Sequence, residues 1–83
     1  MSRIIHVGRI YRHYKGDHYL VEAIATHSET LEKMVIYRQL YGKGEMFARP
    51  YDMFAEELDR AKYPNAKQKY RFELVNAKSV ANH

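Results

Sequence analysis

Residues 9–26 contain two β-forming runs on either side of a Gly16-Asp17 pair, and this pattern constrains the fold more than any other. Both runs are rich in aromatic and branched side chains, which favour strands. Glycine and aspartate between them tolerate the positive φ angles of a two-residue hairpin turn. The sequence therefore predicts an antiparallel hairpin, in a register that places Tyr11 opposite Glu22.

Three further segments are predicted as strands, at residues 33–41, 45–49 and 70–75. The first alternates along its length, but neither of its faces is purely polar, so we expect it in the middle of a sheet. Pro50 ends the second segment, because proline has no N–H to donate to a ladder.

A short helix is predicted at residues 52–58, between the last two strands. Asp52 is expected as its N-cap or first-turn acid. Its buried side is expected to consist of Met53, Phe54 and Leu58.

These elements predict a mainly β fold, a small five-stranded SH3-like barrel with one short helix before the last strand. A closed or nearly closed barrel also protects the edge strands of so small a sheet. The 83 residues form one domain near the lower size limit for a single core. We expect the barrel at about residues 4–75 and a flexible C-terminal tail at residues 76–83.

Composition excludes several classes of protein. The chain has no cysteine, so neither a disulfide frame nor a thiolate zinc site stabilises it. No apolar run approaches the roughly 20 residues that span a bilayer, and the N-terminus is too short and polar for a signal peptide. We therefore expect a cytoplasmic protein with no membrane partner and no cofactor.

Six short motifs occur in a fixed order along the chain. They are HYKG at 13–16, HSET at 27–30, VIYRQLYG at 35–42, RP at 49–50, MF at 53–54 and RF at 71–72. Together they resemble a small bacterial family of unknown function, DUF1653. The resemblance implies an SH3-like barrel, in agreement with the strand pattern, and it implies no activity.

The HSET segment has the composition of a catalytic cluster, a metal half-site or a polar turn. Ser28 directly follows His27, so in extended chain their side chains point to opposite faces and make a poor nucleophile–base pair. We predict instead that Ser28 and Thr30 bond to nearby backbone amides in a turn. His27 and Glu29 are suitable metal ligands, but no strong ligand signature accompanies them and no metal site is predicted.

One group of polar residues suggests a pocket for a small ligand or an enzymatic reaction. Arginine forks bind carboxylates and phosphates alike, and two arginines lie where a strand meets a turn or loop. The competing expectation is an internal pair between these arginines and a glutamate such as Glu29, since an unpaired buried charge is costly. The candidate ligand-binding residues are His13, His27, Glu29, Tyr37, Arg49 and Arg71.

A second group suggests a basic and aromatic surface. The net charge of +4 is concentrated at residues 1–20 and 60–83, and tyrosines alternate with basic residues along the first strands, as on barrels that stack bases. The competing expectation is ordinary solubilising charge, with Tyr11, Tyr19 and Tyr37 in the core. The candidate nucleic-acid-binding residues are Arg12, Tyr14, Lys15, Arg38 and Tyr41.

We therefore expect a small binding module without enzymatic activity, with RNA or another phosphate-bearing partner on the basic and aromatic surface. The first alternative is the small-ligand or enzymatic pocket. The second is a protein-interaction or homodimerisation domain that uses an open edge of the sheet.

Overall fold

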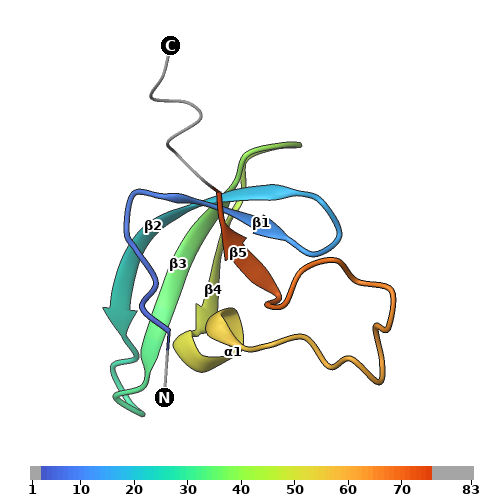
Figure 1. Ribbon diagram of the computed structural model, residues 1–83. Coiled ribbons are helices and arrows are strands. Elements are labelled where there is room, and N and C mark those ends of the chain that lie inside the picture. Colours follow the sequence, from blue (N-terminus) through green and yellow to red (C-terminus); the bar gives the residue numbers. More distant parts are fainter. Residues whose placement is uncertain (1–2, 76–83) are drawn as a thin grey trace.

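The computed structural model describes residues 3–75, and five antiparallel strands form one sheet in the order β4-β3-β2-β1-β5. Figure 1 shows that the sheet is curled and that α1 lies at the end of β4. The mainly β fold with one short helix before the last strand is confirmed, and the predicted tail at 76–83 lies outside the described residues. The elements are β1 (Ile10–His13), β2 (His18–Thr26), β3 (Lys33–Gln39), β4 (Met46–Pro50), α1 (Tyr51–Ala55) and β5 (Phe72–Leu74).

The first hairpin has a longer loop than predicted. Its backbone closes where the His13 N–H donates to the Asp17 carbonyl at 2.8 Å, so the loop has three residues, 14–16, rather than two. Tyr11 consequently lies opposite Tyr19, and the predicted pairing with Glu22 is wrong. The observed register turns Tyr19 towards the core, where the predicted one would have buried the carboxylate of Glu22.

A β-bulge in β2 keeps the core face of this strand apolar. The register with β3 shifts between Val21 and Ala23, which leaves Glu22 without an opposite residue. The extra residue allows Val21, which is fully buried, and Ile24, which packs against the core, to share one face. A strictly alternating strand would turn one of the two outward.

Phenylalanine rings lie at the centre of the core. Phe54 of α1 stacks on Phe72 of β5, with ring centroids 4.1 Å apart and planes only 7° apart. Tyr11 and Tyr37 are buried, as predicted, and Tyr19 packs partly buried against them. Phe54 thereby contacts residues of β1, β3 and β5 at once.

The helix is shorter than predicted and begins earlier. Pro50 is its N-cap residue and makes no side-chain capping bond, so Asp52 is a first-turn acid. Extended backbone at Glu56 ends the helix, which leaves the buried Leu58 beyond it. The prediction that Met53 is buried is wrong, because a helix of little more than one turn buries only part of its circumference.

The HSET segment forms the turn between β2 and β3, and its histidine does most of the capping. His27 Nδ1 accepts hydrogen bonds from the backbone N–H groups of Glu29 at 3.2 Å and Thr30 at 3.3 Å. The Thr30 hydroxyl accepts from the Glu32 N–H at 3.3 Å, as predicted. The role expected of Ser28 is thus taken by the neighbouring imidazole.

Leu31 closes this turn in an unfavourable conformation, and we predict that Leu31→Gly stabilises the protein. Its φ is 63°, a left-handed value that costs an ordinary residue about 1–2 kcal/mol. Its side chain is 72% exposed, so little burial is lost. After the greater chain entropy of glycine is subtracted, we expect the free energy of unfolding to rise by about 0.5–1 kcal/mol in urea denaturation.

The matched control is Ser28→Gly in the same exposed turn, where the backbone has no positive φ to relieve. This variant should be no more stable than the wild-type protein. A Leu31→Gly protein that unfolds at lower urea concentration than the wild type would contradict the prediction.

Candidate functional site: an aromatic pocket

A pocket of about 230 Å³ opens on the concave side of the sheet, and all five strands or their ends contribute to it. We call it the aromatic pocket. Its walls come from inward-facing residues of neighbouring strands, which the period of two places side by side. The aromatic pocket is lined by His13, Tyr19, Tyr37, Gln39, Tyr41, Phe47, Arg49 and Phe72.

Tyr37 is the centre of the aromatic wall. Its ring centroid lies 5.4 Å from that of Tyr19, 5.8 Å from that of Phe47 and 5.6 Å from that of Phe72. Such tilted and edge-on contacts hold the rings in fixed orientations. Tyr41 and Phe47, each 39% exposed, lie at the outer part of this wall.

The acceptor atoms of three polar lining residues are already used by the protein. The Tyr37 hydroxyl accepts from Arg49 Nε at 3.1 Å, and Gln39 Oε1 accepts from the Glu45 N–H at 3.1 Å. His13 Nδ1 accepts from the Lys15 N–H at 3.2 Å. The polar hydrogens that remain for a ligand are those of the Arg49 Nη groups, the Gln39 amide N–H and the Tyr37 O–H.

His13 adds a further donor, because it stays neutral. Burial lowers the pKa of His13 to about 4, and the positive charges of Arg71, Lys15 and Arg49 act in the same direction against a smaller opposing effect of Asp17. A neutral imidazole whose Nδ1 accepts a hydrogen bond carries its proton on Nε2. The three cations around His13 outnumber the one acid, Asp17, so the local field favours anions.

Two tyrosine hydroxyls complete the pocket. The oxygens of Tyr19 and Tyr41 lie 2.6 Å apart, so one donates to the other and the accepting hydroxyl keeps a free hydrogen. Burial, and then the bond with Tyr41, raises the pKa of Tyr19, which therefore stays protonated at neutral pH. None of the eight lining residues is acidic.

We predict that acid destabilises the protein through His13. Its pKa is lower in the folded than in the unfolded state, so between pH 6.5 and about 4 the unfolded chain binds more protons. The contribution of neutral His13 to the free energy of unfolding is therefore fully present above pH 6.5, and it declines as the pH falls towards 4. Because His13 is only partly buried, we discount for solvent screening and expect a loss of about 1–2 kcal/mol.

Urea denaturation at several pH values measures this loss, and His13→Asn is the informative variant. The Asn side-chain oxygen can still accept the Lys15 N–H, but it cannot titrate in this range. The variant should therefore lose less stability than the wild type between pH 6.5 and 4. An identical pH dependence of the two proteins would contradict the prediction.

The two candidate arginines have different partners. Arg71 forms the predicted internal ion pair, but with Glu56 instead of Glu29, through bonds from both Nε and Nη2. Arg49 has no acidic partner within residues 3–75, so the predicted pair is wrong for it. Its guanidinium lies 5.6 Å above the Phe72 ring, and only its Nε is held by a side chain.

The six candidate ligand-binding residues do not share one pocket. Three of them line the aromatic pocket, and Arg71 lies close enough to influence the pKa of His13. His27 and Glu29 lie in the turn beyond the other end of β2, a nine-residue strand that is roughly 30 Å long. His27 and Glu29 follow the end of β2, whereas the aromatic pocket lies near its start, so the two groups of residues cannot meet. Their role as ligands stays a prediction.

The five candidate nucleic-acid-binding residues are divided between two faces. Tyr14 and Lys15 lie in the loop beside the aromatic pocket, and Tyr41 lines it. Arg12 and Arg38 alternate with the buried Tyr11 and Tyr37 and so point to the outer face. Arg38 bonds there to Glu22 at 2.8 Å and to the Gly44 carbonyl at 2.9 Å. Alternation along β1 and β3 thus separates Arg12 and Arg38 from the tyrosines.

A tyrosine pair, formed by the predicted Tyr14 and by Tyr63, which was not predicted, extends the aromatic pocket. The rings of Tyr14 and Tyr63 lie 4.9 Å apart, and His13 lies 4.5 Å from Tyr14. Lys15 lies 5.9 Å from the Tyr14 ring and Lys62 lies 5.7 Å from the Tyr63 ring. A side-chain hydrogen bond with Tyr14 lowers the pKa of Tyr63, and the positive charge of Lys62 lowers it further. We call Tyr14, Tyr63, Lys15 and Lys62 the tyrosine patch.

Several of these residues were not singled out from the sequence. Tyr19, Gln39, Phe47 and Phe72 line the aromatic pocket, and strand alternation was the signal that could have placed them with Tyr37. Tyr63 carries no such signal, because it lies in an irregular segment between α1 and β5.

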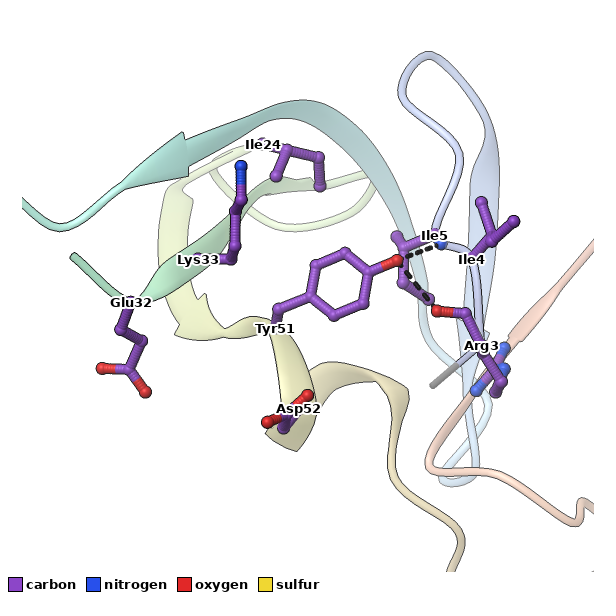
Figure 2. A pocket seen from close by; sticks show the side chains of 8 residues that line it. All are labelled: Arg3, Ile4, Ile5, Ile24, Glu32, Lys33, Tyr51 and Asp52. Atoms are coloured by element: carbon purple, nitrogen blue, oxygen red, sulfur yellow. Dashed lines mark hydrogen bonds between the residues drawn. The ribbon is translucent and has the colours of Figure 1, made fainter. Parts of the chain in front are cut away.

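A larger groove of about 800 Å³ lies on another part of the molecule. Figure 2 shows the Tyr51 ring in this groove, with its hydroxyl turned away to the N-terminal segment. That hydroxyl accepts from the Ile5 N–H at 2.7 Å and donates to the Arg3 carbonyl at 2.9 Å. Two basic residues, Arg3 and Lys33, and two acidic residues, Glu32 and Asp52, also line the groove, so its lining shows no preference for a ligand charge.

Two other kinds of site were sought in the described part of the chain. Residues 3–75 contain no group of three or more histidine, aspartate or glutamate side chains that could hold a metal ion. The only helix among these residues is far shorter than a bilayer-spanning segment.

Comparisons with known proteins give two matches. Residues 9–74 match the model of a family described as "Protein of unknown function (DUF1653)". The chain is also similar to a crystal structure of a DUF1653 protein from Bordetella bronchiseptica, at 35% sequence identity and a TM-score of 0.72. That similarity covers 92% of this chain and 94% of the other. No curated protein matches the chain.

Proposed function

Because the chain belongs to the DUF1653 family, whose description assigns no activity, we propose a function from its geometry: a non-enzymatic module that binds single-stranded RNA. The aromatic pocket takes one nucleotide, and the tyrosine patch stacks a neighbouring base. The strand order β4-β3-β2-β1-β5, with a short helix before β5, supports an SH3-like assignment for the scaffold.

The surplus of donors in the aromatic pocket carries this proposal. Arginine, amide, imidazole and phenol groups offer hydrogens there, while the acceptors of Tyr37, Gln39 and His13 are bonded within the protein. The matching ligand is rich in acceptors and negatively charged, as phosphates and base carbonyls are. The lining holds no carboxylate, serine or cysteine, and the low pKa of His13 makes its imidazole a weak base, which supports binding rather than catalysis.

The tyrosine patch supports a single-stranded partner. Stacking on exposed aromatic rings needs a base whose face is free, and bases inside a duplex do not offer one. Lys15 and Lys62 lie beside the two rings, where they suit the phosphates between successive bases. The contact between His13 and Tyr14 makes the patch continuous with the pocket.

Fluorescence anisotropy with a labelled single-stranded RNA tests the function, in a salt series with a duplex of the same sequence as competitor. We expect binding that weakens with salt and prefers the single strand. Lys15→Gln should weaken binding and reduce the salt slope by about one unit, because one phosphate contact is lost. Lys33→Gln, which removes an exposed lysine at the opposite end of the sheet, is the matched control. Absence of binding at low salt would refute the proposal.

A small-ligand pocket is the second candidate, favoured by the concave shape and small volume of the aromatic pocket. Calorimetry with a mononucleotide and with inorganic phosphate separates the two functions. A mononucleotide that binds as tightly as the RNA would favour the small ligand, because the tyrosine patch would then contribute nothing.

A further inference from the structure

The β4 strand is an edge of the sheet with no neighbour on its outer side among the described residues. It has five residues, whereas the opposite edge strand β5 has three. The side chains of Met46 and Phe47 are 50% and 39% exposed, and Ala48 is exposed as well. A sheet edge that combines free backbone groups with exposed apolar side chains is a template for pairing with another strand.

The ladder with β3 determines which backbone groups of β4 are free. The Gln39 N–H donates to the Glu45 carbonyl at 2.9 Å, so these two residues form a hydrogen-bonded pair. Hydrogen-bonded pairs recur at every second position, so Phe47 and Arg49 also bond to β3. The N–H and C=O groups of Met46 and Ala48 consequently point outward, and no loop or side-chain hydrogen bond within residues 3–75 reaches them.

We propose that β4 pairs with β4 of a second copy of this chain, antiparallel and with the twofold axis at Ala48. In this register each Ala48 N–H donates to the Ala48 carbonyl of the other copy. Met46 lies opposite Pro50 of the other copy, and the ladder ends there because proline has no N–H to donate. The smallest side chain of β4 lies on the axis, so it does not obstruct the approach of the second copy.

Self-complementary side chains favour a second copy over a different peptide. Phe47 and Arg49 flank Ala48 symmetrically, so the twofold register places each Phe47 opposite Arg49 of the other copy. Residues in such a non-hydrogen-bonded pair are especially close, which suits a cation–π contact. Both residues line the aromatic pocket, so the dimer brings two pockets together along one continuous sheet. The dimer does not depend on the ligand that the pockets bind.

Sedimentation equilibrium of the whole chain, from about 1 to 300 µM without RNA, tests the proposal. We expect a mass that doubles with concentration. Ala48→Lys and Ala48→Glu place like charges opposite each other on the axis, so each should raise the dissociation constant roughly tenfold or more. Ala48→Thr adds a small uncharged β-former and should still dimerise.

The variant Ala48→Pro tests dimer formation without disturbing the fold. It removes an outward N–H and leaves the β3 ladder intact, a position at which edge strands tolerate proline. Circular dichroism should show a folded protein, and sedimentation should show a monomer. A wild-type protein that stays monomeric at 300 µM would overturn the proposal, and so would a dimer that all three disruptive variants preserve.

Discussion

Phe54→Ala is expected to lower the free energy of unfolding by about 3–5 kcal/mol, the largest stability effect of any single substitution considered for this protein. The Phe54 side chain is 0% exposed. Its ring contacts Tyr11 at 5.5 Å, Tyr37 at 5.1 Å and Phe72 at 4.1 Å between centroids. Truncation opens a cavity between the sheet and α1 that rings held from several sides cannot fill by small movements.

The size of the domain makes this loss severe. A chain of 83 residues has a total stability of about 4–12 kcal/mol, so the variant retains little or none of it. Urea denaturation followed by circular dichroism measures the change. Met53→Ala in the same helix is the control, because Met53 is 46% exposed and its truncation should cost less than about 1 kcal/mol. Equal losses in the two variants would contradict the placement of Phe54 in the core.

Arg49→Gln is expected to weaken RNA binding roughly 10- to 100-fold, the largest functional effect. Arg49 is the cation of the aromatic pocket, and its Nε bond to the Tyr37 hydroxyl directs the rest of the guanidinium. A hydrogen bond to a charged group is worth about 1.5–3 kcal/mol, which corresponds to this range of affinity. Arg49→Lys retains the charge without the fork and should have an intermediate effect.

Fluorescence anisotropy of the same labelled RNA measures the loss of affinity. The variant Arg38→Gln shows which face of the sheet binds the RNA. Arg38 is already bonded to Glu22 and Gly44 on the outer face, so its replacement should change affinity much less. Equal losses for Arg38→Gln and Arg49→Gln would show that RNA contacts both faces of the sheet. If Arg49→Gln bound the RNA with full affinity, the aromatic pocket would not be part of the binding site.

The strands were predictable because their signals are local. Alternation and β-formers placed all five. The hairpin register was not predictable from the turn residues, because His13 accepts the Lys15 N–H and stabilises a longer loop. The helix ended early for a similar reason, since Leu58 is buried without being helical.

The candidate site was predictable only in part. His13, Tyr37, Tyr41 and Arg49 were all singled out and all line the aromatic pocket. They were assigned to two different surfaces, because the sequence does not say which side chains face inward until the register is known. The pairing of Arg71 with Glu56 was missed, since these residues lie 15 positions apart and meet only when the chain returns to β5.

The sequence by itself determined the number of strands, the place of the helix and the tyrosines of the core, because hydrophobic periodicity acts over a few residues. Only the tertiary structure decided which hydrogen-bond acceptors are already used in the pocket, which charges are paired and which strand edge is free. Those properties depend on contacts between distant segments, and a shift of one residue in the register changes them all. The HSET segment shows the difference: its turn follows from the sequence, while its distance from Arg49 and Arg71 follows from the length and position of β2 in the sheet.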